Sequence, residues 1–138
     1  MLLNKKPHTV YPYKFKQSNH VLKFGQFGIK TLSFIRITER QLKSLERFLW
    51  QTIKKVMNNK KKTIKLWNLV ILNLQLTKLS SESRMGKGKG ISYAKASFLK
   101  PGTVLFEFDE VSNQQILRIF SSLKKKISFK ISLVKKLY

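Results

Sequence analysis

Two stretches of the chain repeat apolar residues at the three- and four-residue spacing of an amphipathic helix. They predict helices over residues 38–58 and 113–126. Each begins with a capping-box pattern, Thr38 with Gln41 and Ser112 with Gln115, in which two side chains bond the first backbone N–H groups. The apolar positions, which we expect to face the core, are Leu42, Leu45, Leu49, Ile53 and Val56 in the first helix and Ile116, Ile119, Phe120 and Leu123 in the second.

Other segments show the alternation and short apolar runs of β-strands. They predict two strands around Gly25 and Gly28, where we expect a bulge or close backbone approach, and then strands over 64–79, 91–99, 103–108 and 127–133. Pro101-Gly102 predicts a type II turn that joins its flanking strands into a hairpin. The expected fold is α+β: a two-layer sandwich of a mostly antiparallel sheet and two amphipathic helices, with an extended Gly-Lys loop.

The first 19 residues differ from the rest. They lack a helical period and contain Pro7 and Pro12, so we predict an extended arm, followed by a single α+β domain over 20–138. Aromatic residues alternate in the arm with four lysines that are candidate RNA ligands: Lys5, Lys6, Lys14 and Lys16. Lysines bind phosphates and rings stack on exposed bases, although a solvated tail covering the domain edge is the alternative.

The charge balance narrows the class of partner. The chain has 29 Lys and Arg residues against 6 acids, a net charge of +23, which favours nucleic acid as the partner and leaves an anionic membrane surface as the alternative. The first predicted helix has few acids on its polar face, so we expect that face to lie along a phosphate backbone rather than to be only solvated. The candidate residues there, together with the preceding Arg36, are Arg40, Lys43, Arg47, Lys54 and Lys55.

Little in the sequence supports catalysis. There is no cysteine, and the two histidines and six acids show no metal-ligand spacing, so we predict neither an enzyme nor a metal or other cofactor. Glu107, Asp109 and Glu110 cluster before the second helix, where we expect them to favour its dipole. The longest uncharged run, residues 66–77, is too short to cross a bilayer, and no signal peptide or presequence pattern is visible.

Arg84-Met85-Gly86-Lys87-Gly88-Lys89-Gly90 is the most distinctive stretch. Glycines let a backbone approach a partner closely while the cations between them meet phosphate. A flexible, solvated loop is the alternative. A nucleotide-binding P-loop is disfavoured because Gly90, rather than Ser or Thr, follows Lys89.

Several segments of the chain resemble, in the same order, segments of a universal family of large-subunit ribosomal proteins, the one numbered sixteen in bacterial naming. The resemblance spans most of residues 21–136, and its motifs are Phe24-Gly25-Gln26-Phe27-Gly28-Ile29-Lys30, Ile37-Thr38-Glu39-Arg40-Gln41, the strand with Trp67, the Arg84 to Gly90 run, Lys100-Pro101-Gly102-Thr103-Val104-Leu105-Phe106-Glu107 and the final helix and strand. The Arg-Met-Gly-Lys-Gly-Lys-Gly run is the specific part.

The resemblance implies a protein that binds large-subunit rRNA beside the aminoacyl-tRNA site, with the Gly-Lys loop pointing toward the peptidyl-transferase region. Arg84, Lys87 and Lys89 would contact RNA, and the glycines would permit close approach. The implied partners are large-subunit rRNA, aminoacyl-tRNA in the A site and other ribosomal proteins, without membrane insertion or a homo-oligomer. A basic nucleic-acid-binding or membrane-surface protein outside the ribosome is the alternative.

The chain departs from the family pattern in two places. Its arm is rich in Lys and aromatic residues where the family has Arg and Gly, and residues 72–83 contain no proline. Together with the preference for lysine, these departures indicate a mitochondrially encoded member from a protist. We therefore expect a mitochondrial ribosome in the matrix, with a plastid or the bacterial cytoplasm as the alternatives.

Overall fold

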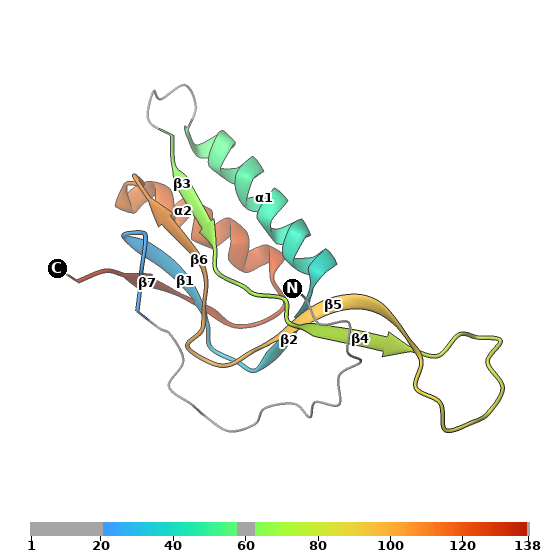
Figure 1. The fold of residues 1–138 in the computed structure, drawn as a ribbon. Helices are drawn as coiled ribbons and strands as arrows, with labels where there is room; N and C mark the ends of the chain where they lie inside the picture. Colours follow the sequence, from blue (N-terminus) through green and yellow to red (C-terminus); the bar gives the residue numbers. More distant parts are fainter. Residues whose placement is uncertain (1–20, 58–62, 138) are drawn as a thin grey trace.

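The computed structural model describes residues 21–57 and 63–137. Its elements in chain order are β1 (Phe27–Thr31), β2 (Ile35–Thr38), α1 (Glu39–Met57), β3 (Lys65–Asn68), β4 (Leu74–Lys78), β5 (Ile91–Leu99), β6 (Val104–Asp109), α2 (Asn113–Lys126) and β7 (Ile131–Lys135). The expected α+β fold with antiparallel strands and two helices is confirmed (Figure 1). The predicted arm, with Lys5, Lys6, Lys14 and Lys16, lies outside the described residues.

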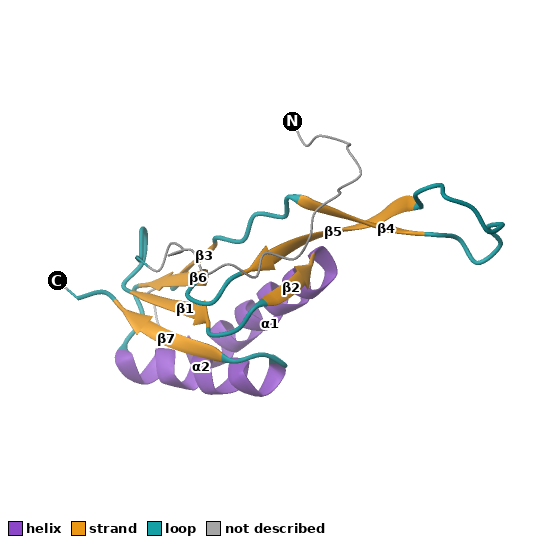
Figure 2. Ribbon diagram, turned by 90° about the horizontal axis from the view of Figure 1, so that it is seen from below, coloured by secondary structure: helices purple, strands orange, loops and turns teal. Residues whose placement is uncertain are grey.

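The strands form two sheets. One has the strand order β3-β6-β1-β7 and the other β2-β5-β4. Both helices lie along one face of the four-stranded sheet, and the β4 and β5 strands extend past this layer (Figure 2). The body is therefore the expected sandwich, from which part of the three-stranded sheet projects.

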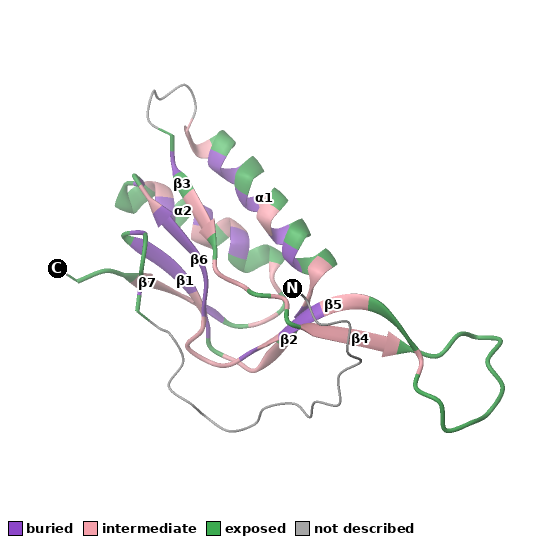
Figure 3. Cartoon of the chain, in the orientation of Figure 1, coloured by how far each residue is buried: buried purple, intermediate pink, exposed green. Residues whose placement is uncertain are grey.

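Both helices begin where their capping patterns predict. Thr38 N donates to Gln41 Oε1 (3.0 Å), and Gln41 N donates to Thr38 Oγ1 (3.4 Å). Ser112 and Gln115 make the same reciprocal pair at 3.0 and 3.3 Å. The predicted apolar stripes face the core (Figure 3), with Val56 and Phe120 half-buried at the margin and the other members buried: Leu42, Leu45, Leu49, Ile53, Ile116, Ile119 and Leu123.

Glu107 lies in the middle of β6 and is completely buried. Its carboxylate accepts hydrogen bonds from three successive backbone N–H groups: Lys23 (3.0 Å), Phe24 (2.6 Å) and Gly25 (2.8 Å). The segment before β1 is thus held against β6, where a Cβ on Gly25 would overlap the backbone oxygen of Phe108. The predicted close approach is confirmed, and Glu107 supplies the attraction that maintains it.

The prediction that Glu107, Asp109 and Glu110 favour the dipole of the second helix is wrong for Glu107. The acids before the second helix were expected to favour its dipole, yet the first turn of α2 contains no acidic residue. Glu107 instead binds the backbone of residues 23–25, which precede β1, and Glu110 Oε1 lies 2.6 Å from Lys65 Nζ. This ion pair raises the pKa of Lys65 above its ordinary value. Asp109 is half-buried at the end of β6.

Pro101-Gly102 forms the predicted turn, but the predicted hairpin is wrong. Gly102 has φ 87°, and Thr103 N donates to Lys100 O (3.1 Å). The flanking strands do not pair, since β5 belongs to one sheet and β6 to the other. Buried Thr31 holds the turn instead, by accepting from Gly102 N (2.7 Å) and donating its hydroxyl to Lys100 O (2.8 Å). The turn therefore connects β5 of the three-stranded sheet to β6 of the four-stranded sheet.

We expect Gly102→Val to lower the free energy of unfolding by roughly 1–3 kcal/mol, because a β-branched residue is strained at positive φ. Urea unfolding measures the loss. Gly88→Val is the matched control, because a Cβ at Gly88 would meet no atom within 4 Å and the φ of Gly88 is not in the positive region. Equal stability of the two variants would contradict the role assigned to Gly102.

The predicted strand over 64–79 is two strands in different sheets. β3 pairs with β6, and β4 pairs with β5. The Asn68 side chain accepts from Val70 N (3.0 Å), a local turn that ends β3. In β4, Leu74, Gln75 and Leu76 are all half-buried, so the expected division into buried and exposed faces is absent there. The closing strand, predicted over 127–133, is shorter and lies later in the chain, since β7 spans Ile131–Lys135.

Candidate RNA interface

The Gly-Lys loop lies at the tip of a projecting hairpin (Figure 1). β4 and β5 pair from Leu74 with Ala96 to Lys78 with Ile91. β2 pairs with β5 only from Ala96 onward, so residues 91–95 are held by β4 alone. Residues 79–90 connect the two strands beyond the layer formed by the helices and the four-stranded sheet. This geometry presents the loop to a partner at a distance from the core.

Local contacts fix the base of this loop. Ser83 N donates to Ser80 O (3.2 Å), and the hydroxyls of these serines lie 2.6 Å apart. Arg84 follows directly. On the other side of the loop, a Cβ on Gly90 would overlap the backbone carbonyl of Lys78. The hairpin therefore closes only with a glycine at position 90.

The tip of the loop has different requirements. Residues 81–89 are exposed, and Met85 is as accessible as in an extended chain. A Cβ on Gly86 or Gly88 would meet no atom within 4 Å, and neither has the positive φ of Gly102. The fold therefore explains Gly90 but requires glycine at neither 86 nor 88. Arg84, Lys87 and Lys89 surround these two positions.

The cationic face predicted for the first helix lies on α1. All five of its basic side chains are exposed: Arg40, Lys43, Arg47, Lys54 and Lys55. Lys43 Nζ lies 2.7 Å from Glu39 Oε1, and this pair holds the pKa of Glu39 below its ordinary value. The other four take part in neither of the ion pairs found in residues 21–57 and 63–137. They leave α1 with a cationic outer face.

This face also carries an aromatic residue that was not among the predicted site residues. Trp50 is 40% exposed, three residues after Arg47 and four before Lys54. This spacing places the indole on the same helix face as those cations. The sequence contained a signal for this residue, because Trp50 occupies a position that the helical spacing assigns to the polar face. Basic and aromatic side chains together are typical of surfaces that bind nucleic acid.

Arg36 and Arg40 come together, although they belong to different elements. Arg36 lies on β2 and Arg40 in the first turn of α1, and both line one hollow with Lys126 at the end of α2. Lys126 was not among the predicted site residues. The Gly-Lys loop points away from this region (Figure 1), so the predicted residues form separate surfaces rather than one site.

The few acids leave these surfaces cationic. Of the six in the chain, Glu107 is buried and bonded to backbone, while Glu39 and Glu110 are paired with lysines. In the described part of the chain, no three His, Asp or Glu residues are grouped as a metal site would need. No helix there has the length and apolar character to cross a membrane. Polyanion binding is the property that this charge distribution favours.

Comparisons with known proteins agree with this inference. Residues 4–134 match the family model of ribosomal protein L16p/L10e. The chain is 52% identical over 131 residues to large ribosomal subunit protein uL16m of Chondrus crispus, covering 95% of this chain and 94% of that protein. It is 37% identical over 114 residues to uL16 of Rhodopseudomonas palustris (83% and 77% covered) and 32% identical over 111 residues to uL16c of Emiliania huxleyi (80% and 75% covered).

Proposed function

Because the chain belongs to the ribosomal protein L16p/L10e family, we propose that its Gly-Lys loop binds large-subunit rRNA beside the aminoacyl-tRNA site. The chain is a structural constituent of the large ribosomal subunit and not an enzyme. It is mitochondrial, as is its relative uL16m of Chondrus crispus. In the proposed arrangement the loop helps to order the RNA that holds tRNA near the peptidyl-transferase region.

The observation that best supports a loop contact is the pair of glycines that the fold does not need. Glycine loses more conformational freedom on ordering than any other residue, so two at an exposed tip are costly unless a partner uses the bare backbone. Space is open around Gly86 and Gly88 in the free chain. A partner lying against this backbone would meet Arg84 and Lys87 beside it. Phosphate is the group that such cations bind.

We further propose that α1 and the N-terminal arm extend this contact. The outer face of α1 would follow a phosphate backbone with Arg40, Arg47, Lys54 and Lys55, and Trp50 would stack on an unpaired base. Lys5, Lys6, Lys14 and Lys16 of the arm, residues 1–19, would bind further phosphates. In this proposal residues 20–138 form one RNA-binding domain, with tRNA and other ribosomal proteins as its remaining partners.

The glycine pair supplies a direct prediction. Gly86→Ala combined with Gly88→Ala should leave stability unchanged or raise it by up to about 1 kcal/mol, because alanine restricts the unfolded chain. Affinity for large-subunit rRNA should fall roughly tenfold, the equivalent of about 1.4 kcal/mol for a lost close contact. Filter binding and thermal unfolding measure the two effects. Gly90→Ala is the control that should reduce stability, because its Cβ overlaps Lys78. Unchanged affinity of the double variant would contradict the close approach.

The position beside the aminoacyl-tRNA site needs its own test. Met85 is fully exposed at the tip, so a photoreactive amino acid at this position should not disturb the fold. In assembled mitochondrial ribosomes we expect cross-links to rRNA of the peptidyl-transferase region, with a yield that changes when the A site is filled with tRNA. Cross-links confined to distant rRNA or to proteins would reject this location.

A further inference from the structure

The hollow lined by Arg36, Arg40 and Lys126 lies between the beginning of α1, β2 and the end of α2, apart from the Gly-Lys loop. Its volume is about 520 Å³, within the range of roughly 300–1,000 Å³ that holds small organic ligands. We name it the α1–α2 groove. The charged and aromatic lining residues are Arg36, Arg40, Lys126 and Phe129, and the remainder are aliphatic or neutral polar.

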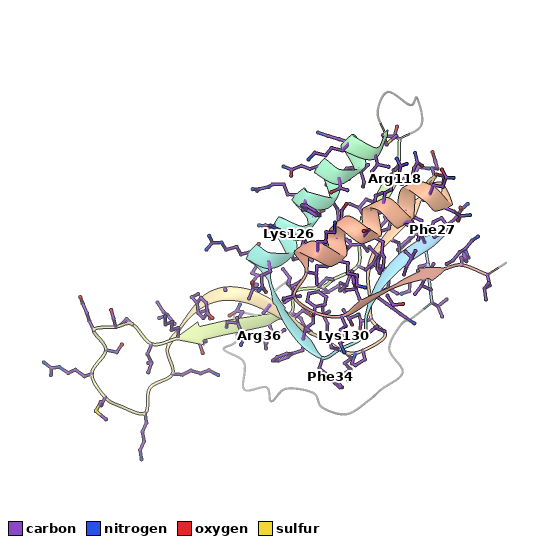
Figure 4. The ribbon with its side chains drawn as sticks, turned by 180° about the vertical axis from the view of Figure 1, so that it is seen from behind. Phe27, Phe34, Arg36, Arg118, Lys126 and Lys130 are labelled. Atoms are coloured by element: carbon purple, nitrogen blue, oxygen red, sulfur yellow. The ribbon has the colours of Figure 1, made fainter. Side chains whose placement is uncertain are left out.

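The rim of the α1–α2 groove is cationic. Arg36, Arg40 and Lys126 come from three different elements, are all exposed and have no carboxylate beside them in the groove lining. Lys126 Nζ lies 6.0 Å from the centre of the Phe48 ring on α1, a contact that holds the ammonium group close to this helix. Figure 4 shows Lys126 where α2 ends beside α1, with Arg36 and Lys130 at the same end of the molecule.

The floor of the groove is apolar. The lining includes Phe129, Ile127 and Ile35, which are half-buried and pack against the core, and Ile37, which is buried. The lining also contains three exposed, neutral hydrogen-bonding side chains: Gln41, Ser44 and Ser128. A cationic rim by itself suits any phosphate surface, including a duplex. An aromatic, concave floor below that rim suits a flat apolar group attached to phosphates.

We propose that the α1–α2 groove binds one unpaired nucleotide of the large-subunit rRNA, its flanking phosphates on Arg36, Arg40 and Lys126 and its base against Phe129. The proposal rests on the proposed function, since it names a second point of contact for the same RNA. Bases in duplex RNA are stacked and paired, so only a nucleotide in a loop or bulge can enter. Gln41, Ser44 and Ser128 would bond the base edge or the 2′-hydroxyl.

The test uses the full-length chain and a transcript of large-subunit rRNA without tRNA. Ultraviolet cross-linking followed by mass spectrometry should find a nucleotide adduct on the peptide that contains Phe129. Phe129→Leu keeps the floor apolar but removes stacking, so the adduct should disappear and binding should weaken about tenfold, near the low end for one stacked base. Thermal unfolding checks that the variant folds.

A second variant changes only exposed cations. Arg36→Gln, Arg40→Gln and Lys126→Gln together should reduce the slope of log affinity against log salt by about 1.4, at roughly 0.7 for each of two phosphates on a single strand. The matched control removes the same charge from the exposed side of α2, by Arg118→Gln, Lys124→Gln and Lys125→Gln, and should leave the slope unchanged.

The outcomes separate this proposal from the proposed function. Adducts in the Gly-Lys loop but none in the groove would overturn the groove site, while the loop contact would still be supported. If the α2 control variant reduced the salt slope as much as the groove variant, the groove site would likewise be overturned. Adducts in the groove alone would support the groove and reject the loop. Cross-links from Phe129 to a protein in assembled subunits would show a protein partner and overturn the nucleotide site.

Discussion

Replacing Glu107 with alanine is expected to lower the free energy of unfolding by about 3–5 kcal/mol. The change removes the acceptor for the backbone N–H groups of Lys23, Phe24 and Gly25 at 2.6–3.0 Å. Leaving one buried donor unsatisfied costs roughly 1–3 kcal/mol, and the donors here range from buried to part-buried. The cavity left by the side chain adds to the loss.

Tryptophan fluorescence offers a local measurement of this effect. Trp67 stacks on Phe24 with 5.9 Å between ring centres, so its emission should change when the segment that Glu107 holds detaches. A Trp50→Phe background leaves Trp67 as the only indole, since the chain has two tryptophans. Glu82→Ala removes an exposed carboxylate and should not alter the urea midpoint. A Glu107→Ala midpoint equal to that of Glu82→Ala would contradict the assigned role.

The largest expected effect on binding follows from neutralising the loop cations. Arg84→Gln, Lys87→Gln and Lys89→Gln together should reduce the salt slope of rRNA binding by about 2, at roughly 0.7 per phosphate on a single strand, and should weaken affinity roughly 50-fold at 0.15 M salt. Stability should not change, because these side chains are exposed at the hairpin tip. Filter binding over a series of salt concentrations measures both quantities.

The α2 variant with Arg118, Lys124 and Lys125 changed to Gln is again the control of equal charge. If it weakens binding as much as the loop variant, general attraction between the chain and RNA explains the result, and a specific loop contact is rejected. Unchanged affinity of the loop variant would favour the alternative of a solvated loop. Either result would leave membership in the ribosomal protein family untouched, because that rests on residues 4–134 as a whole.

Local patterns determined the elements that depend on local interactions. A capping box involves residues three apart, so Thr38 with Gln41 and Ser112 with Gln115 placed the helix starts correctly. Apolar spacing identified the buried helix faces, since one face of each helix must leave water. The charge of +23 favours a polyanion as the partner, and membership in the ribosomal protein family agrees with that prediction.

Tertiary structure decided which elements meet. Glu107 bonds residues 82 to 84 positions away, and no local pattern distinguishes that carboxylate from one that caps a helix. The turn at Gly102 was predictable from two residues, but its flanking strands find partners in different sheets through β1 and β2. Which strands pair depends on how the apolar faces of all the strands and helices are buried together. The sequence of one strand does not contain this information.

The pattern of residues along the chain thus sufficed for the class of fold and the extents of both helices, and it supplies the predicted RNA-binding residues. The three-dimensional packing decided that residues 64–79 divide between two sheets and that the hairpin projects. It also brought Arg36, Arg40 and Lys126 around one groove, from positions up to 90 residues apart. The physical reason is that the spacing of apolar residues indicates which face of a helix or strand is buried. A binding site depends instead on which helices and strands pack next to one another.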